Sequence, residues 1–287
     1  MGRYFRVGIK MRNLLVSVSG GKTSMRMASL LKESPIADNQ VYIFANTGQE
    51  SEGTYEFLKL CDQKYGFNII WLESVINDEG VGTTWKVVDF YTAHRGDGLF
   101  EPMIQKYGIP NKSYPHCTRE LKLAPIHKYV KRALGWDDYD TAIGIRNDEH
   151  RRVSRGGEYN IVYPLIDNWP MDKADVNYWW DQQGFNLEIP EYNGNCLTCF
   201  KKSTKKLAMV HRDNPKSFDF NRRMEKYKHI GDHHDRVFFR GNKNTEQLVE
   251  EFKLYKSFLD QGSLFSQEGD EDDGCSESCE MYPMVLR

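Results

Sequence analysis

Short apolar runs alternate with amphipathic segments along the first half of the chain. Residues 14–18 and 41–45 are apolar runs of strand length, and each precedes a segment whose apolar residues recur at helical spacing. A third apolar run, 67–72, comes directly after Gly66, a residue type that often ends helices. Strands that alternate with helices indicate a parallel sheet with crossover helices. The pattern therefore predicts an α/β fold.

Three later segments extend this pattern. Residues 139–143 have the composition of another strand, 172–183 that of a helix capped by Asp172, and 244–261 that of a long helix. We expect a twisted, mostly parallel sheet with helices on both faces, followed by a C-terminal helical region. The sequence contains no apolar run of membrane-spanning length, so a membrane partner is not expected.

The turn after the first apolar run is the strongest chemical signal. Residues 19–24 read Ser-Gly-Gly-Lys-Thr-Ser and lead into an amphipathic segment. A strand, a glycine turn and a helix together direct backbone N–H groups and a positive helix end at one point, which suits a phosphate. The turn is not a Walker A motif, because that pattern needs a glycine where the chain has Val16. We predict a nucleotide site here.

Polar and basic residues follow the later strands. Asn46-Thr47-Gly48 follows the second apolar run, and Arg146 and Arg151 follow the run at 139–143. Because the carboxyl ends of parallel strands meet at one edge of a sheet, we expect these residues beside the glycine turn. Guanidinium groups favour bidentate contacts with phosphate or sulfate.

Between these turns, residues 116–125 carry Arg119 and Lys122, which are three positions apart. On an α-helix these two side chains would share a face and could bind one anion together.

The cysteines add a second kind of chemistry. The chain has Cys61, Cys117, Cys196, Cys199, Cys275 and Cys279. Cys61 lies on the apolar side of its segment and is expected in the core. Cys196 and Cys199 have Cys-x-x-Cys spacing, which lets two thiolates bind one metal but does not distinguish zinc, an iron–sulfur cluster and a dithiol redox pair.

Taken in order, these motifs resemble the PP-loop of the ATP pyrophosphatase superfamily and, within it, the phosphoadenylyl-sulfate (PAPS) reductase family. The glycine turn matches the PP-loop pattern Ser-Gly-Gly-x-Asp-Ser, except that Thr23 stands where Asp is usual. Residues 46–48 resemble the family's Asp-Thr-Gly turn. Residues 117–125 resemble its Cys-Thr-x-x-Leu-Lys-x-x-Pro segment, and residues 144–152 its Gly-x-Arg-x-x-Glu-x-x-Arg turn.

The resemblance covers roughly residues 13–210 and implies an adenine nucleotide alpha-hydrolase-like fold that binds ATP or PAPS. The nucleotide-binding residues that it implies are Ser19, Gly20, Gly21, Lys22, Thr23, Ser24, Asn46, Thr47, Gly48, Arg119, Lys122, Gly144 and Arg146. We expect Lys22, Arg146 and Arg151 to offset charge that develops on the phosphates. Magnesium is a further candidate cofactor, and Thr23 removes an acidic side chain that could have held it.

The resemblance also gives the cysteines a role. Iron–sulfur reductases of the family hold a [4Fe–4S] cluster with a Cys-Cys pair and a distant Cys-x-x-Cys, and here the pair is His116-Cys117. Cys117, Cys196 and Cys199 would leave one iron without a cysteine ligand, a position that holds an exogenous sulfur in PP-loop thiolation enzymes. The alternative is a structural zinc with His116 or another residue as the fourth ligand.

Near the C-terminus, Cys279-Glu280 resembles, in reversed order, the Glu-Cys pair of the family's catalytic tail. The resemblance implies that Cys279 is a nucleophile. The acidic run 268–273 opposes a low-pKa thiolate there. A flexible tail, or Cys275 and Cys279 as extra metal ligands, are the alternatives.

The net charge of −2 conceals an uneven distribution. Residues 201–256 contain 15 Lys and Arg against 8 Asp and Glu, and the residues after them are acidic. Basic and aromatic residues together can form a nucleic-acid surface, whereas inward packing of Leu207, Met209 and Val210 beneath solvated lysines explains the same pattern. The expected division is a PAPS reductase-like domain at 11–212, a basic helical extension at 213–262 and an acidic, flexible tail at 263–287.

The function that these features indicate is adenine-nucleotide-dependent sulfur chemistry. A substrate oxygen would attack the α-phosphate of ATP, pyrophosphate would leave, and the activated substrate, tRNA or DNA, would accept sulfur from a donor at the cysteine site. One alternative is reduction of PAPS or adenylyl sulfate by Cys279 with a thioredoxin-like reductant. The other is a non-catalytic nucleotide- or nucleic-acid-binding module with structural zinc. The cysteine usage favours a reducing, cytoplasmic location.

Overall fold

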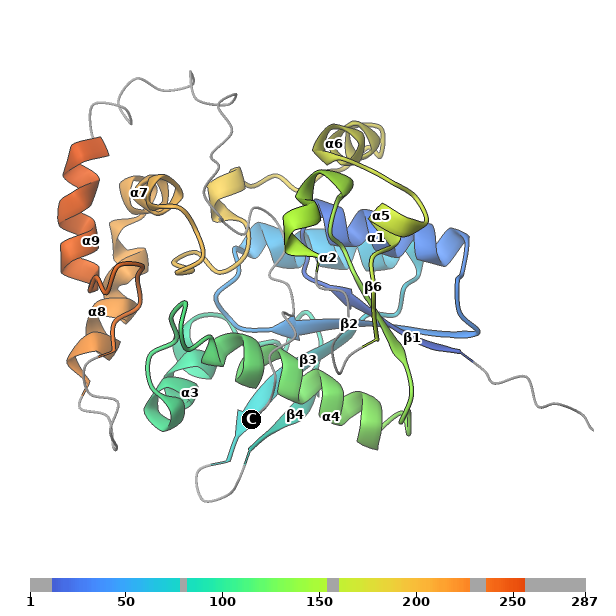
Figure 1. Ribbon diagram of the computed structural model, residues 1–287, viewed down its shortest axis with the longest axis horizontal. Helices are drawn as coiled ribbons and strands as arrows, with labels where there is room; N and C mark the ends of the chain where they lie inside the picture. Colours follow the sequence, from blue (N-terminus) through green and yellow to red (C-terminus); the bar gives the residue numbers. More distant parts are fainter. Residues whose placement is uncertain (1–11, 78–81, 154–159, 228–235, 256–287) are drawn as a thin grey trace, which may run out of the picture.

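A six-stranded sheet forms the centre of the computed structural model, which describes residues 12–77, 82–153, 160–227 and 236–255 (Figure 1). Its strands are β1 (Asn13–Val18), β2 (Asn39–Asn46), β3 (Ile70–Ile76), β4 (Thr83–Val88), β5 (Asp140–Ile143) and β6 (Asn160–Val162). The order across the sheet is β4-β3-β2-β1-β5-β6, with β4 antiparallel and the others parallel. The predicted α/β fold with a mostly parallel sheet is confirmed.

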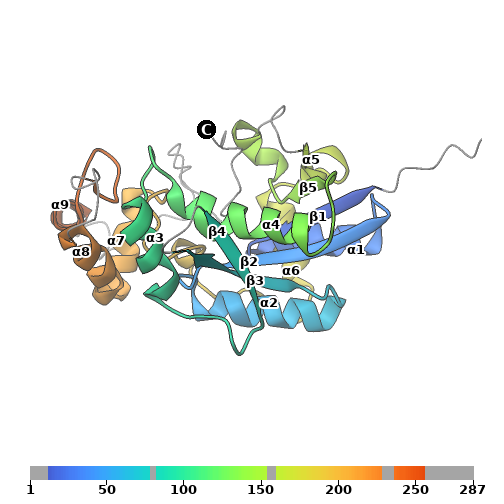
Figure 2. The ribbon, with the colours of Figure 1, turned by 90° about the horizontal axis from the view of Figure 1, so that it is seen from below.

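Helices cover both faces of this sheet. The helices are α1 (Lys22–Glu33), α2 (Glu52–Tyr65), α3 (Phe100–Tyr107), α4 (Ala124–Arg132), α5 (Pro164–Asp167), α6 (Lys173–Asp181), α7 (Thr204–Asp213), α8 (Asp219–Lys226) and α9 (Thr245–Phe252). Figure 2 shows α2 and α4 on opposite sides of the strands. In the described parts of the chain, every helix is too short or too polar to span a bilayer.

The central strand β1 shows why its sequence is a continuous apolar run. Leu14 and Val16 are buried in the apolar cluster formed with α1, α2 and α6. Leu15, which points to the other face, is buried in the cluster formed with α4. A strand covered on both faces needs apolar side chains at successive positions rather than an alternating pattern.

The order of the strands fixes where the functional turns meet. The chain passes from β1 through β2 and β3 on one side, and then crosses to β5 on the other side of β1. This reversal next to β1 is the topological switch point, where open α/β sheets bind ligands outside the carboxyl ends of their strands. The turns after β1, β2 and β5 therefore lie together at one edge.

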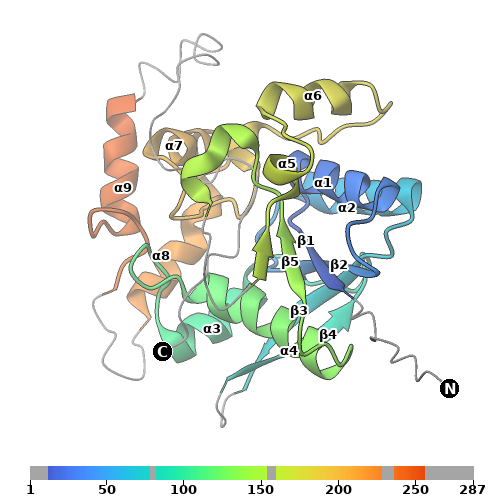
Figure 3. The same ribbon diagram turned by 45° about the vertical axis from the view of Figure 1, so that its right-hand side comes forward.

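A second body of helices packs beside the sheet. Helices α7, α8 and α9 lie together next to α3 (Figure 3), and their apolar cluster has Phe218 at its centre with none of its surface exposed. Cys196 and Phe200, on the loop before α7, belong to the same cluster. The helical extension predicted at 213–262 is thus packed, over its described residues, against the loop that carries the Cys-x-x-Cys pair.

The predicted elements differ from the observed ones in their limits. Only the second half of the run at 67–72 belongs to β3, which begins at Ile70 and continues to Ile76. Helix α2 ends at Gly66 as predicted, with that glycine in the left-handed region at a φ of 63°. The helix predicted at 244–261 is α9 followed by one 3₁₀ turn to Tyr255, and its remainder lies outside the described residues. The pairing of β4 and the short β6 were not predicted.

Acid should destabilise the fold through His127 on α4. Burial lowers the pKa of His127 to about 4, whereas the unfolded chain has a histidine pKa near 6.5. The unfolded state therefore binds the proton first, so stability falls as the pH drops from about 6.5 toward 4, by at most about 3 kcal/mol. We expect His127→Gln to flatten this part of a urea-unfolding profile against pH.

Candidate active site

The turn after β1 is shaped by Gly20 and Ser24. Gly20 has a φ of 78°, and a Cβ atom there would lie 2.5 Å from Thr54 Cγ2 on α2. Ser24 Oγ accepts the backbone N–H of Ser19 at 3.1 Å and donates to the carbonyl oxygen of Gly21 at 3.0 Å. These contacts hold the turn closed over the N-terminus of α1, whose positive end favours an anion.

Helix α6 contacts the same turn from outside. Trp180 Nε1 donates to the carbonyl oxygen of Lys22 at 2.9 Å, and Lys22 Nζ lies 3.5 Å from Asn177 Oδ1. Trp180 is fully buried, so this contact fixes the start of α1. In this structure the Lys22 ammonium is turned toward α6.

The turn after β5 is joined to the turn after β1. A Cβ atom on Gly144 would lie 2.9 Å from Ser24 Cα, so this close approach requires glycine. Arg146 Nη1 lies 3.3 Å from Thr23 Oγ1, and Arg146 Nε donates to Asp148 Oδ1 at 2.9 Å. Arg146 is 4% exposed, so a buried guanidinium connects the two turns while Asp148 balances part of its charge.

The turn after β2 is held by a buried hydrogen-bond network. Asn46 Oδ1 accepts the backbone N–H of Gly48 at 3.0 Å, and the Tyr55 hydroxyl lies 2.9 Å from the same oxygen. Glu50 Oε1 accepts the Thr47 hydroxyl at 2.7 Å. Burial, together with the nearby Glu50 carboxylate, raises the pKa of Tyr55, which keeps its hydroxyl protonated as a donor. Such satisfied buried networks make a turn rigid.

A pocket opens at the carboxyl ends of β1 and β2, which we call the strand-end pocket. Its lining residues are Ser17, Val18, Ser19, Phe44, Ala45, Glu50, Lys122, Ile126 and Asn195. Ser19 and Lys122 were predicted from the sequence as nucleotide-binding residues, whereas Glu50 and Asn195 were not. The position at the switch point is where a nucleotide is expected in this type of sheet.

Cys117 and Lys122 come from one π-helical segment, Cys117–Leu123, which continues into α4. A π-helix has i→i+5 hydrogen bonds, so residues five positions apart lie on the same side, and such segments are frequent at functional sites. Arg119, which was expected to share a face with Lys122, instead pairs with Glu120 at 2.6 Å from Nε to Oε1. Arg119 lines neither of the two pockets described here.

The loop with Cys196 and Cys199 is held by a buried lysine. Lys202 is 2% exposed, and its Nζ donates to the carbonyl oxygens of Tyr192 at 2.5 Å and Leu197 at 3.1 Å. The backbone N–H of Leu197 donates to the carbonyl oxygen of Gln49 at 3.1 Å, which ties the loop to the turn after β2. Lys202 is therefore a structural residue of the cysteine loop.

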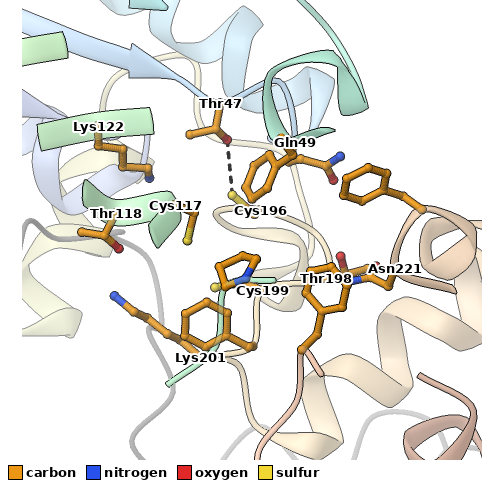
Figure 4. A pocket seen from close by; sticks show the side chains of 15 residues that line it. Thr47, Gln49, Cys117, Thr118, Lys122, Cys196, Thr198, Cys199, Lys201 and Asn221 are labelled. Atoms are coloured by element: carbon orange, nitrogen blue, oxygen red, sulfur yellow. Dashed lines mark hydrogen bonds between the residues drawn. The ribbon is translucent and has the colours of Figure 1, made fainter. Parts of the chain in front are cut away.

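Cys117, Cys196 and Cys199 line one pocket, which we call the cysteine pocket (Figure 4). Cys196 Sγ lies 3.4 Å from Thr47 Oγ1, the contact that Figure 4 marks with a dashed line. The other lining residues are Gln49, Phe100, Pro110, Thr118, Lys122, Thr198, Phe200, Lys201, Phe220, Asn221 and Phe238. The structure thus brings a cysteine from the π-helical segment beside the Cys-x-x-Cys loop, in a pocket whose walls include four phenylalanines.

The side chains available as ligands in the cysteine pocket decide which kind of metal centre would fit it. Among the described residues, no three His, Cys, Asp or Glu side chains converge closely enough to hold one metal ion. A structural zinc needs four donors around one point, and His116, its proposed fourth ligand, has its Nε2 3.0 Å from Arg236 Nη1. Thiolates that bind separate irons of a cluster do not share one point, so three cysteines around an apolar pocket fit a cluster better than a zinc ion.

Lys122 lines both the strand-end pocket and the cysteine pocket, and it is 9% exposed. Thr47 lines the cysteine pocket and Glu50 the strand-end pocket, and these two residues share a hydrogen bond. The two pockets are therefore neighbours, separated by Lys122 on one side and by Thr47 with Glu50 on another.

Of two further predicted catalytic residues, one lies away from both pockets and the other is outside the described residues. Arg151 is exposed on the 3₁₀ segment Asn147–Arg152 and lines neither of the two pockets. Cys279 lies outside the described residues, as does Cys275, so its role as a nucleophile stays a prediction.

Several basic residues of the stretch that begins at residue 201 pair with acidic neighbours. Arg222 contacts Asp219 and Glu246, Arg223 contacts Glu101, and Lys206 contacts Glu191, all at 2.8–3.0 Å. Leu207 and Val210 are buried beneath it, and Met209 is half-buried. These observations favour inward packing with charges balanced at the surface over a bare cationic face for nucleic acid.

Comparison with known proteins bears on the family of this chain. Residues 13–98, from β1 to the segment after β4, match the family model described as the phosphoadenosine phosphosulfate reductase domain. The uncharacterized nin region protein ORF290 of Escherichia phage lambda is 32% identical over 282 residues, which cover 93% of this chain and 94% of that protein.

More distant similarities cover smaller parts. The uncharacterized protein MJ0973 of Methanocaldococcus jannaschii is 32% identical over 116 residues, which are 40% of this chain and 22% of that protein. A crystal structure of PAPS reductase from Candida auris, in complex with phosphate, is 17% identical with a TM-score of 0.39, covering 62% of this chain and 76% of that one. The full-length match shows that the chain belongs to one family with the phage lambda protein ORF290, and its residues 13–98 match the phosphoadenosine phosphosulfate reductase domain.

Proposed function

We propose that this chain binds ATP at the strand-end pocket, adenylates an acceptor with it, and uses the cysteine pocket to deliver sulfur to that acceptor. PAPS is the nucleotide of the alternative function, a reductase. The observation that carries this proposal is the position of Lys122, which lines both pockets. A group activated at the nucleotide would need to move only past this side chain to meet the cysteines. A fold that bound a nucleotide alone would not require the two pockets to be neighbours.

The first step would take place at the turn after β1. The backbone N–H groups of residues 19–24 and the N-terminus of α1 would bind the phosphates, as helix N-termini do for anions. An acceptor oxygen attacks the α-phosphorus of ATP, a new P–O bond forms, and the bond to pyrophosphate breaks. Lys22 and Arg146 would offset the charge on the phosphates, Lys22 after its side chain turns from α6.

The second step would take place in the cysteine pocket. A hydrosulfide from a sulfur donor attacks the adenylated carbon, the C–O bond breaks, AMP leaves, and one proton is released, so no electron is gained or lost. Cys117, Cys196 and Cys199 are the residues that would hold a [4Fe–4S] cluster. When bound with three cysteine ligands, such a cluster supplies one iron on which the sulfur can be held before transfer.

The acceptor that fits these walls best is a base of tRNA or DNA. Phe100, Phe220 and Phe238 line the cysteine pocket, and aromatic side chains stack on nucleobases. Thr118 Oγ1 and Asn221 Oδ1 also lie in this pocket, buried and with no hydrogen-bond partner among the described residues. Polar atoms of this kind would give an acceptor its orientation.

The proposal is tested by assaying the two candidate nucleotides side by side. Protein purified without oxygen is analysed for iron and sulfide, and is then incubated with ATP, with PAPS, and with tRNA or DNA and a sulfide source. Release of pyrophosphate from ATP together with sulfur incorporation supports the proposal. Release of sulfite from PAPS, without pyrophosphate from ATP, would identify a reductase. Neither product, with zinc in place of iron, would leave a nucleotide-binding module.

A pair of cysteine variants separates the cysteine pocket from the fold. We expect Cys196→Ser to remove most of the iron and to abolish sulfur incorporation, because a serine hydroxyl is a poor substitute for a thiolate. Cys61→Ala is the matched control: Cys61 lies on α2 and is fully buried, and burial raises the pKa of its thiol, which suits a core residue. Equal iron content in the two variants would contradict the proposed ligand set.

A further inference from the structure

Asn195, the residue before Cys196, has an unusual backbone conformation. Its φ is 57°, in the left-handed region that non-glycine residues rarely adopt. Asparagine tolerates this region better than most residue types, and strained positions of this kind gather at binding sites.

The side chain of Asn195 is also unusual. Asn195 is 8% exposed, and its Nδ2 atom is buried with no hydrogen-bond partner among the described residues. A buried amide donor without a partner costs free energy, so its place in a folded protein needs a reason. Asn195 lines the strand-end pocket together with Ser19 and Lys122, and a ligand in that pocket could accept its N–H.

We propose that the Asn195 amide donates to an anionic oxygen of the nucleotide bound in the strand-end pocket, and that this contact couples nucleotide binding to the cysteine loop. The inference rests on the proposed function for the presence of a nucleotide in this pocket. Lys122 brings a positive charge to the same pocket, which favours an anionic partner, while the Glu50 carboxylate that also lines the pocket is engaged by the Thr47 hydroxyl.

The coupling follows from the chain itself. Cys196 is the next residue, and it lines the cysteine pocket beside Thr47. A nucleotide that fixes the Asn195 side chain also fixes the backbone on the amino side of Cys196. The cysteine loop is then most ordered when a nucleotide is present, so sulfur chemistry is favoured only beside a loaded nucleotide site.

Asn195→Gly tests the contact because glycine keeps the positive φ and removes the amide. We expect its dissociation constant, measured by calorimetry with ATP and with PAPS, to rise about tenfold to a hundredfold for whichever nucleotide the unaltered protein binds. Asn195→Asp, of the same size but negatively charged, should lose more affinity. Asn242→Gly is the matched control, since Asn242 has a φ of 60° at an exposed position away from both pockets.

Hydrogen exchange of the backbone amides of residues 194–199 tests the coupling. Nucleotide should slow this exchange in the unaltered protein and leave it unchanged in Asn195→Gly, while the melting temperatures of the two ligand-free proteins agree. If Asn195→Gly and Asn195→Asp both bound nucleotide with unaltered affinity, the inference would be overturned and the proposed function would stand. Failure of the unaltered protein to bind either nucleotide would overturn both.

Discussion

Gly20→Ala should lower the affinity for ATP or PAPS by more than about a hundredfold. The added Cβ atom would lie 2.5 Å from Thr54 Cγ2, and the residue would have to keep a φ of 78°. Left-handed backbone costs an alanine about 1–2 kcal/mol, and overpacking against α2 adds about 1–3 kcal/mol. The turn can relieve both by moving, but its N–H groups then no longer point at the phosphates. Calorimetric titration with each nucleotide measures the loss.

Gly66→Ala is the control that isolates backbone strain from the loss of the phosphate site. Gly66 ends α2 with a φ of 63°, and a Cβ atom there would meet nothing within 4 Å among the described residues. We expect this variant to be less stable by about 1 kcal/mol and to bind nucleotide normally. Comparable affinities for Gly20→Ala and Gly66→Ala would mean that the turn after β1 is not the phosphate site.

The difference between these two glycines also shows what the sequence could predict. The turn after β1 was identified because strand, glycines and helix are consecutive, so the local pattern already contains the geometry. The left-handed end of α2 at Gly66 was predicted for the same reason. In contrast, the requirement for glycine at position 144 comes from Ser24, which is distant in the chain.

The π-helical segment marks a limit of the sequence argument. The three-residue spacing of Arg119 and Lys122 predicted a shared face, because side chains three positions apart share a face on an α-helix. The i→i+5 hydrogen bonds of the π-helix instead place Lys122 with Cys117, and Arg119 pairs with Glu120. A π-helical segment of this length has no characteristic spacing of apolar residues. The sequence pattern therefore could not distinguish it from an α-helix.

Long-range packing explains the other residues that were missed. Phe220, Asn221 and Phe238 come from the helical extension, and they line the cysteine pocket because α8 packs beside α3. Nothing in their local sequence indicates this. Asn195 had one weak signal, its place in a glycine- and asparagine-containing loop before Cys196, but its lack of a partner is visible only in the folded chain.

Lys122→Met should lower the rate of sulfur incorporation by about 100- to 1,000-fold, the usual effect of removing one group that stabilises developing charge. Methionine keeps much of the length and the apolar stem of the side chain and removes the ammonium. Because Lys122 lines both pockets, the loss should affect nucleotide affinity as well as turnover. Single-turnover kinetics at saturating nucleotide separate the two effects.

Lys131→Met, at an exposed position on α4, into which the π-helical segment continues, is the control and should leave both quantities unchanged. Lys122→Arg keeps the charge but carries a larger, planar group into a site that is 9% exposed, so it should recover affinity only in part. If Lys122→Met weakened nucleotide binding alone and left turnover at saturation intact, Lys122 would serve the strand-end pocket only. The passage of an activated group from one pocket to the other would then have to depend on Thr47 and Glu50, the pair that separates the pockets on their other side.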